Sequence, residues 1–245
     1  MNYVFPDGFY YNISGYERIY HIHNEKTGGT SLNYIFLSQG GESGEEVYSQ
    51  MLKTKGWCVI SNDKIFVGWN KFLIEKGYYF YAFSHIPTHM LKIPSNTFTV
   101  TCLRDPINRF ISNYKEYLTY KTKNIKHPAL KHRNKFYGGS FKDYMLSVPR
   151  KLLLGQLYMF SESFNIDEAY EKIRSCSYFF FTEQFSAGIN DLSSKTGLPL
   201  KTIHARKSSI ENNSISDEDK IILRELLEPE YFLMNKLKNA MEHSC

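Results

Sequence analysis

Residues 18–37 constrain the fold of this chain more than any other segment. Residues 18–22 (Arg-Ile-Tyr-His-Ile) form a short apolar run, residues 23–31 read His-Asn-Glu-Lys-Thr-Gly-Gly-Thr-Ser, and residues 32–37 are again mainly apolar. This order predicts a strand, a tight loop and the first turns of a helix. Such a loop points several backbone N–H groups at one spot, at the positive end of the helix dipole. The segment therefore predicts an anion-binding cradle.

The loop differs from a Walker A loop in the position of its lysine. Lys26 comes two residues before Gly28, whereas a Walker A loop carries its lysine after the second glycine. The alternative is a simple glycine turn with a solvated lysine. If the loop binds an anion, the expected ligands are Lys26, Thr27, Gly28, Gly29, Thr30 and Ser31.

A second candidate phosphate site follows the apolar, β-branched run 97–103. This run predicts a buried strand, and it ends in Arg104-Asp105-Pro106. Pro106 suits the first position of a helix over 106–122. A guanidinium at the end of a strand can hold a phosphate through two parallel N–H bonds, and Ser112 reaches the same side two helical turns later. The alternative role for Arg104 is a cap or an ion pair with Asp105.

Together the two motifs resemble those of sulfotransferases that use 3′-phosphoadenosine 5′-phosphosulfate (PAPS). The resemblance is to the carbohydrate branch, which includes the heparan sulfate 2-O- and 6-O-sulfotransferases. It implies that the loop binds the 5′-phosphosulfate, that Arg104 and Ser112 bind the 3′-phosphate, and that no metal is needed. It also implies a sulfotransferase fold and sulfation of a glycan or glycolipid hydroxyl.

Two weaker matches follow in the order that the resemblance requires. Residues 178–185 (Tyr-Phe-Phe-Phe-Thr-Glu-Gln-Phe) resemble the family's strand that ends in Thr-Glu-x-Phe. Residues 205–209 stand where the family has a basic loop over the nucleotide, which implies that Arg206 and Lys207 contact phosphate. A solvated loop is the alternative for this pair.

His85 is the predicted general base. It ends the expected strand at 78–84, and the carbohydrate branch has a catalytic histidine at the corresponding place. An imidazole titrates near neutral pH and can take the proton of an acceptor hydroxyl. In this mechanism Lys26 stabilises charge on the leaving phosphate. The rivals for the base are His89, Glu25, His21 and His23; Glu25 replaces a proline usual in the family, and the pair His21 and His23 lacks a third metal ligand at suitable spacing.

The remaining elements predict an α/β fold. We expect short strands near 65–69 and 78–84, a helical section at 140–176 interrupted at Pro149, and a strand at 178–182. A helix at 184–196 and a final helix from Ser216 to Met241 complete the list, while residues 40–63 form a polar stretch. Strands alternating with helices favour a P-loop-like parallel sheet covered on both faces, with Lys26, His85 and Arg104 at the carboxyl ends of strands. With 245 residues, of which 42% are hydrophobic, the chain can form one domain over 1–245.

Charge and composition narrow the possible partners. A net charge of +5 suits a polyanionic nucleotide, but no basic stripe or known module predicts nucleic-acid binding. The basic residues between 121 and 135 indicate either a solvated loop or contact with an anionic acceptor. No apolar run is long enough for a transmembrane segment and residues 1–20 lack a signal-peptide pattern, so we expect a cytoplasmic protein. The cysteines form no C-x-x-C pair, and buried free thiols are expected.

The acceptor is the least constrained part of the prediction. A glycan or glycolipid hydroxyl leads, because the loop and His85 resemble the carbohydrate branch, and a peptide tyrosine or small-molecule hydroxyl comes second. Two other classes stay open, a P-loop-type nucleotide kinase and a nucleotide-binding module without catalysis. The sequence makes no prediction of oligomeric state.

Overall fold

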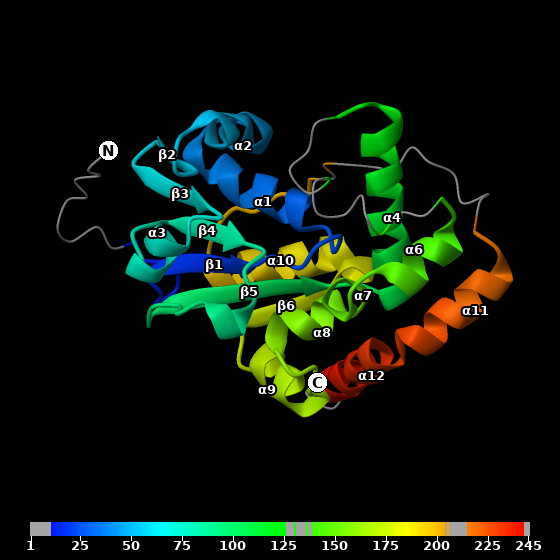
Figure 1. The fold of residues 1–245 in the computed structure, drawn as a ribbon. Coiled ribbons are helices and arrows are strands. Elements are labelled where there is room, and N and C mark those ends of the chain that lie inside the picture. The colour runs from blue at the N-terminus through cyan, green and yellow to red at the C-terminus, as the bar shows by residue number, and fades with distance from the viewer. Residues whose placement is uncertain are drawn as a thin grey trace.

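The structure is a computed structural model that describes residues 11–125, 130, 136, 139–203, 205 and 215–242. At its centre lies a six-stranded sheet with the order β2-β3-β4-β1-β5-β6 (Figure 1). The strands are β1 (Arg18–Ile22), β2 (Cys58–Ser61), β3 (Lys64–Gly68), β4 (Tyr81–Ser84), β5 (Thr97–Leu103) and β6 (Tyr178–Phe181). The helices are α1 (Gly29–Leu37), η1 (Ser38–Gly40), α2 (Gly44–Lys53), α3 (Lys71–Lys76), η2 (Thr88–Met90), α4 (Pro106–Thr122), α6 (Phe141–Ser147), α7 (Arg150–Leu153), α8 (Gly155–Phe160), α9 (Ile166–Arg174), η4 (Thr182–Gln184), α10 (Phe185–Thr196), α11 (Asp217–Leu226) and α12 (Glu228–Glu242).

The sheet is parallel except at one edge. β1 pairs in parallel with β4 on one side and β5 on the other, β3 pairs with β4, and β6 pairs with β5. β2 runs antiparallel to β3. The two-residue turn between them, Asn62-Asp63, has both residues at positive φ (47° and 59°), as a tight hairpin requires. The carboxyl ends of β1, β3, β4, β5 and β6 therefore lie at the same edge of the sheet.

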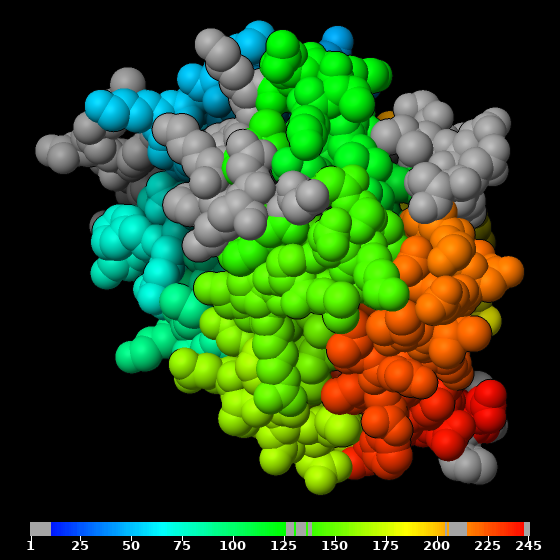
Figure 2. Space-filling view, turned by 45° about the vertical axis from the view of Figure 1, so that its right-hand side comes forward, coloured from blue at the N-terminus to red at the C-terminus, as the bar shows by residue number. Residues whose placement is uncertain are grey.

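Helices cover both faces of the sheet, which confirms the predicted fold class. Alternation along β1 sends Ile19 to one face and Tyr20 and Ile22 to the other. The Ile19 face packs against α1, α2 and α10, and the opposite face packs against the other helices from α3 to α12. Figure 1 shows α1 and α2 above the sheet and α8, α9 and α12 below it. In Figure 2, α6 to α9 and α11 to α12 form one continuous surface.

Several helices begin or end at residues that local sequence signals predicted. Asp105 caps α4 by accepting a hydrogen bond from the Asn108 N–H, and Pro106 occupies the first position. Ser216 caps α11, which has three acidic residues in its first turn. The helical section after 140 breaks before Pro149, as predicted. The single helix expected from Ser216 to Met241 is wrong, because the chain forms α11 and α12 with a break at Leu227 before Pro229.

The polar stretch at 40–63, for which no helix or strand was predicted, has regular structure. It contains α2 and β2, and a further short helix, α3, follows β3. α2 is amphipathic, with Val47 and Met51 buried one turn apart, and Ser43 and Glu46 form a capping box. This capping box, Ser-x-x-Glu in the sequence, is the signal that could have predicted α2.

No helix within the described residues combines the length and the apolar character needed to cross a bilayer.

Candidate active site

The loop between β1 and α1 has the backbone geometry of an anion cradle. Gly28 is in the left-handed region (φ 81°), and so is Lys26 (φ 68°). α1 starts directly after Gly28 without a side-chain cap. Within the described part of the chain, no protein acceptor bonds the N–H groups of Gly28, Gly29 or Thr30. Three unpaired N–H groups at the positive end of a helix suit an anionic ligand.

A histidine ring lies so close to the backbone at position 29 that only glycine fits there. A Cβ atom built on Gly29 would lie 2.0 Å from Cδ2 and Nε2 of His23. Any side chain at this position would have to displace the buried imidazole. The second glycine of the loop therefore allows His23 to pack against the first turn of α1.

Thr182 joins the loop to the end of β5. Its hydroxyl lies 2.9 Å from both the carbonyl oxygen of Thr27 and that of Leu103. Leu103 immediately precedes Arg104, so one side chain connects the two predicted phosphate motifs. The Thr-Glu-x-Phe match at residues 182–185 thus lies beside both motifs.

Arg104 lies directly against the loop. Its Nη1 donates to the carbonyl oxygen of Lys26 at 3.1 Å. Gln156 fixes the backbone of Arg104 from the other side, because its amide accepts from the Arg104 N–H at 2.8 Å and donates to the Arg104 carbonyl at 3.0 Å. Burial lowers the pKa of Arg104, opposed by the nearby carboxylates of Glu183 and Asp105. The structure therefore brings together the two motifs, which lie far apart in the sequence.

Helix α4 presents a carboxylate to the loop lysine. Nζ of Lys26 lies 2.9 Å from Oε1 of Glu116, and both side chains are about three-quarters buried. Ser112 lies one helical turn before Glu116 and so shares its helix face. The half-buried Ser112 therefore lies on the side of α4 that carries the contact with the loop.

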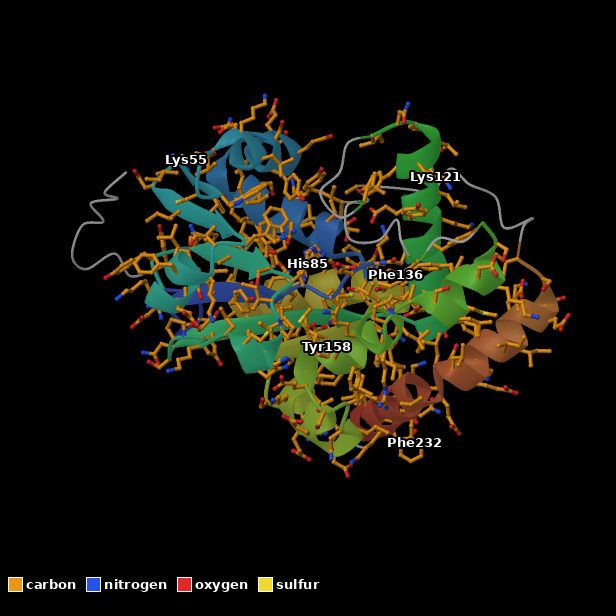
Figure 3. All side chains as sticks on the ribbon, viewed as in Figure 1. Lys55, His85, Lys121, Phe136, Tyr158 and Phe232 are labelled. Carbon is orange, nitrogen blue, oxygen red and sulfur yellow. The ribbon has the colours of Figure 1, made fainter. Side chains whose placement is uncertain are left out.

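His85 follows β4 and is held through one ring nitrogen. Its Nδ1 lies 2.7 Å from the carbonyl oxygen of His23. A carbonyl oxygen only accepts, so Nδ1 carries the proton, and Nε2 of the neutral ring is left as an acceptor. Figure 3 shows His85 near the middle of the molecule. The His85 side chain is half-buried, and the hydrogen bond described for its ring uses Nδ1 rather than Nε2.

Three imidazoles lie in a row at this edge of the sheet, with the first two stacked and His85 tilted against His23. The ring of His23 lies 4.2 Å from that of His85 and 4.8 Å from that of His21, measured between centroids. Burial lowers the pKa of His21 to about 3, although its hydrogen bond to Asn33 opposes the shift. Burial and the neighbouring His85 hold the pKa of His23 well below its usual range. Neutral rings of this kind give His85 a rigid support without adding charge.

The rival bases lie elsewhere or are engaged. Glu25 accepts a hydrogen bond from the Asn113 side chain at 3.2 Å, and the ring of His89 lies 5.2 Å from that of Tyr158. His21 and His23 are buried in the sheet. No cluster of three potential metal ligands occurs among the residues that the structure describes.

The other residues predicted to bind the donor lie in different environments. The Thr27 hydroxyl is buried and donates to the Asn24 carbonyl at 3.0 Å, so it stabilises the loop itself. Ser31 accepts from the Ala205 N–H at 3.0 Å, which brings residue 205 to the start of α1. Thr30 is half-buried. Arg206 and Lys207 lie outside the described residues.

Glu116, Gln156 and Thr182 were absent from the predicted site. Glu116 had a usable signal, because it is four residues after Ser112 on a helix already placed at the site. Gln156 had none, since it comes from α8 and meets Arg104 only through the tertiary fold.

An anion cradle, a guanidinium and an acceptor nitrogen at one sheet edge suit transfer of a charged group to a hydroxyl. A family model described as the sulfotransferase family matches residues 12–213. A search of curated proteins found no match to the chain. The matched region contains the loop, His85, Arg104 and Thr182, and on this match the chain belongs to the sulfotransferase family.

Proposed function

We propose that this sulfotransferase moves the sulfuryl group of PAPS to a hydroxyl of a glycan or glycolipid. The observation that carries the proposal is the hydrogen bond between Arg104 and the Lys26 carbonyl, 3.1 Å long. It places the second cationic group against the loop whose N–H groups form the first anion cradle. A nucleotide with phosphates at both its 3′ and 5′ positions is the ligand that such a paired arrangement favours.

Each end of the donor has its own ligands in this proposal. The N–H groups of residues 28–30, the α1 dipole and Lys26 take the 5′-phosphosulfate. Arg104 and Ser112 take the 3′-phosphate, where a planar guanidinium can form two parallel hydrogen bonds. Lys26 exchanges its ion pair with Glu116 for the phosphate when the donor binds.

Transfer requires one proton acceptor and one site of charge stabilisation. Nε2 of His85 takes the proton of the acceptor hydroxyl, whose oxygen forms a bond to sulfur. The bond between sulfur and the bridging phosphate oxygen breaks, and 3′-phosphoadenosine 5′-phosphate (PAP) leaves with the added negative charge. Lys26 and the loop N–H groups stabilise that charge.

The acceptor class rests on the resemblance of the loop and of His85 to the carbohydrate branch. A peptide tyrosine or a small-molecule hydroxyl would use the same chemistry. The family assignment favours sulfuryl over phosphoryl transfer, and activity with PAPS in the presence of a chelator would separate this enzyme from a magnesium-dependent kinase.

Calorimetry with PAP and with adenosine 5′-phosphate tests the donor assignment. We expect PAP to bind more tightly by about 1.5–3 kcal/mol, the usual contribution of charged hydrogen bonds. Arg104→Ala should remove most of this difference, and Ser112→Ala should remove part of it. Arg174→Ala is the matched control, because Arg174 is exposed near the end of α9, before β6, at the opposite edge of the sheet. Equal affinity of the unmodified protein for both nucleotides would refute the proposal.

A further inference from the structure

The two tryptophans of the chain, Trp57 and Trp69, have an unusual backbone conformation. Both lie in the left-handed region, with φ of 57° and 52°. This region is rare for bulky residues and concentrates where function requires a fixed position. Pairing of the neighbouring strands holds both residues, since the Gly68 N–H donates to the Trp57 carbonyl at 2.9 Å and the Trp69 N–H donates to the Phe83 carbonyl at 3.0 Å.

The two indole rings are in edge-to-face contact, and we call this pair the tryptophan wall (Trp57 and Trp69). Their centroids lie 5.1 Å apart, with the ring planes at 68°. Trp69 packs on Phe83 at 4.8 Å and on Tyr48 at 5.8 Å, so the wall has a rigid base. Trp57 remains 38% exposed. A fixed aromatic surface that stays open to solvent is suited to contact with a ligand.

The tryptophan wall lies near His85, the predicted base. Trp69 follows β3 and His85 follows β4, and these strands run parallel, so both residues lie at the same sheet edge. The ring centroids of Trp69 and His85 are 6.4 Å apart. A ligand ring resting on the wall would therefore lie next to His85.

We propose that the tryptophan wall is the acceptor subsite and that it binds a sugar ring of the glycan. This inference rests on the proposed function, which requires a hydroxyl beside His85. A pyranose has an apolar C–H face that stacks on an indole, while its hydroxyls project from the rim toward neighbouring groups. The wall supplies the apolar contact, and His85 meets one of the hydroxyls at the rim.

Intrinsic fluorescence reports on this surface selectively, because the chain has 2 tryptophans and both are in the wall. We would titrate the protein, saturated with PAP, with tetrasaccharides from cellulose, chitin, hyaluronan and desulfated heparin. N-acetyltyrosinamide serves as the phenolic probe. At least one tetrasaccharide should give a saturable change in tryptophan emission. Trp57→Ala should raise the KM for that acceptor about tenfold, a value consistent with the loss of one aromatic contact.

Controls separate a loss of binding from a loss of folding. Trp57→Phe keeps an aromatic face and should recover most of the affinity. Phe232→Ala removes another exposed aromatic, 63% exposed on α12 and far from His85 in Figure 3, and should leave the KM unchanged. The affinity for PAP, measured on the same samples, tests the donor assignment separately from the wall.

Two results would overturn the inference. One is a saturable response to N-acetyltyrosinamide with none to the tetrasaccharides, which would assign the wall to a phenolic acceptor. The other is no response to any tetrasaccharide, or an unchanged acceptor KM in Trp57→Ala.

Discussion

A single carbonyl oxygen determines which nitrogen of His85 carries the proton. The His23 carbonyl fixes the proton on Nδ1, so Nε2 is the nitrogen that can accept. The Lys26 carbonyl, three residues later in the same loop, holds Arg104. The carbonyls of the loop therefore hold two of the predicted site residues, His85 and Arg104, through hydrogen bonds.

Removal of the imidazole should separate catalysis from donor binding. We expect His85→Ala to lower kcat by about 10²- to 10⁴-fold, the usual contribution of a positioned base, with the affinity for PAP unchanged. Turnover of PAPS and calorimetry with PAP measure the two effects. His89→Ala is the control, since His89 was the nearest rival in the sequence. Near-normal turnover in His85→Ala would exclude His85 from the mechanism.

Buried neutral histidines should make the fold sensitive to acid. The pKa of His21 is lowered to about 3 by burial, so between the unfolded value of about 6.5 and about 3 the unfolded chain binds a proton that the folded chain does not. The unfolding free energy therefore falls as pH drops through this window, by about 1.4 kcal/mol per pH unit for one such histidine.

Urea unfolding at pH 7.5 and pH 5.5 measures this loss. His21→Gln should make the difference between the two pH values smaller by about 1 kcal/mol. An equal pH dependence in His21→Gln and the unmodified protein would contradict the assignment.

Single residues of the site differ in how far the sequence predicts them. Lys26, His85 and Arg104 stand in motifs with fixed neighbours, and all three meet at the loop. Their catalytic and binding roles stay predictions. Glu116 stands in no motif and is marked only by its position one helical turn after Ser112. Gln156 has no sequence signal, because it meets Arg104 only through the tertiary fold.

At the scale of elements, α4 links the two halves of the donor site. It starts directly after Arg104, carries Ser112, and contacts the loop through Glu116 and Asn113. Both contacts join α4 to the loop that is predicted to bind an anion. In the proposed function, PAPS would replace the ion pair between Glu116 and Lys26.

Glu116→Gln should therefore strengthen donor binding. The change removes a competing carboxylate from Lys26, and a partly exposed pair contributes at most about 1 kcal/mol, so we expect the Kd for PAP to fall about two- to fivefold. Calorimetry at low and high salt measures it, and the gain should shrink as salt screens the pair. Glu75→Gln, which breaks the pair with Lys71 on α3, is the control. Weaker binding in Glu116→Gln would show that the carboxylate supports the site.

Strong periodicity decided which elements were predictable. The buried strand 97–103 and the helix after Pro106 were predicted at nearly their observed bounds, because a long apolar run and a proline mark them. α2, α3 and β2 were missed because each is short and has few buried residues. In such segments tertiary contacts, rather than sequence patterns, decide the conformation.

At the scale of the whole molecule, the last helix supports the site from a distance. Glu230 on α12 is fully buried and accepts from the backbone N–H of Gln156 at 2.7 Å and of Leu157 at 3.2 Å. It also lies 3.5 Å from Nε of the buried Arg109, without hydrogen-bond geometry. Gln156 in turn forms hydrogen bonds with the backbone of Arg104, the residue predicted to bind the 3′-phosphate. Arg104 and α12 therefore belong to one polar network.

Because of this network, the folded unit extends beyond the residues that the sulfotransferase family model matches. The match ends at residue 213, yet the counter-charge of Arg109 comes from residue 230. Truncation of the chain to the matched region would leave Arg109 buried without its counter-charge. Removal of one partner of a buried ion pair usually lowers the free energy of unfolding by about 3–5 kcal/mol. A transfer of this site to another protein scaffold would therefore have to include α12, which supports the site through Glu230.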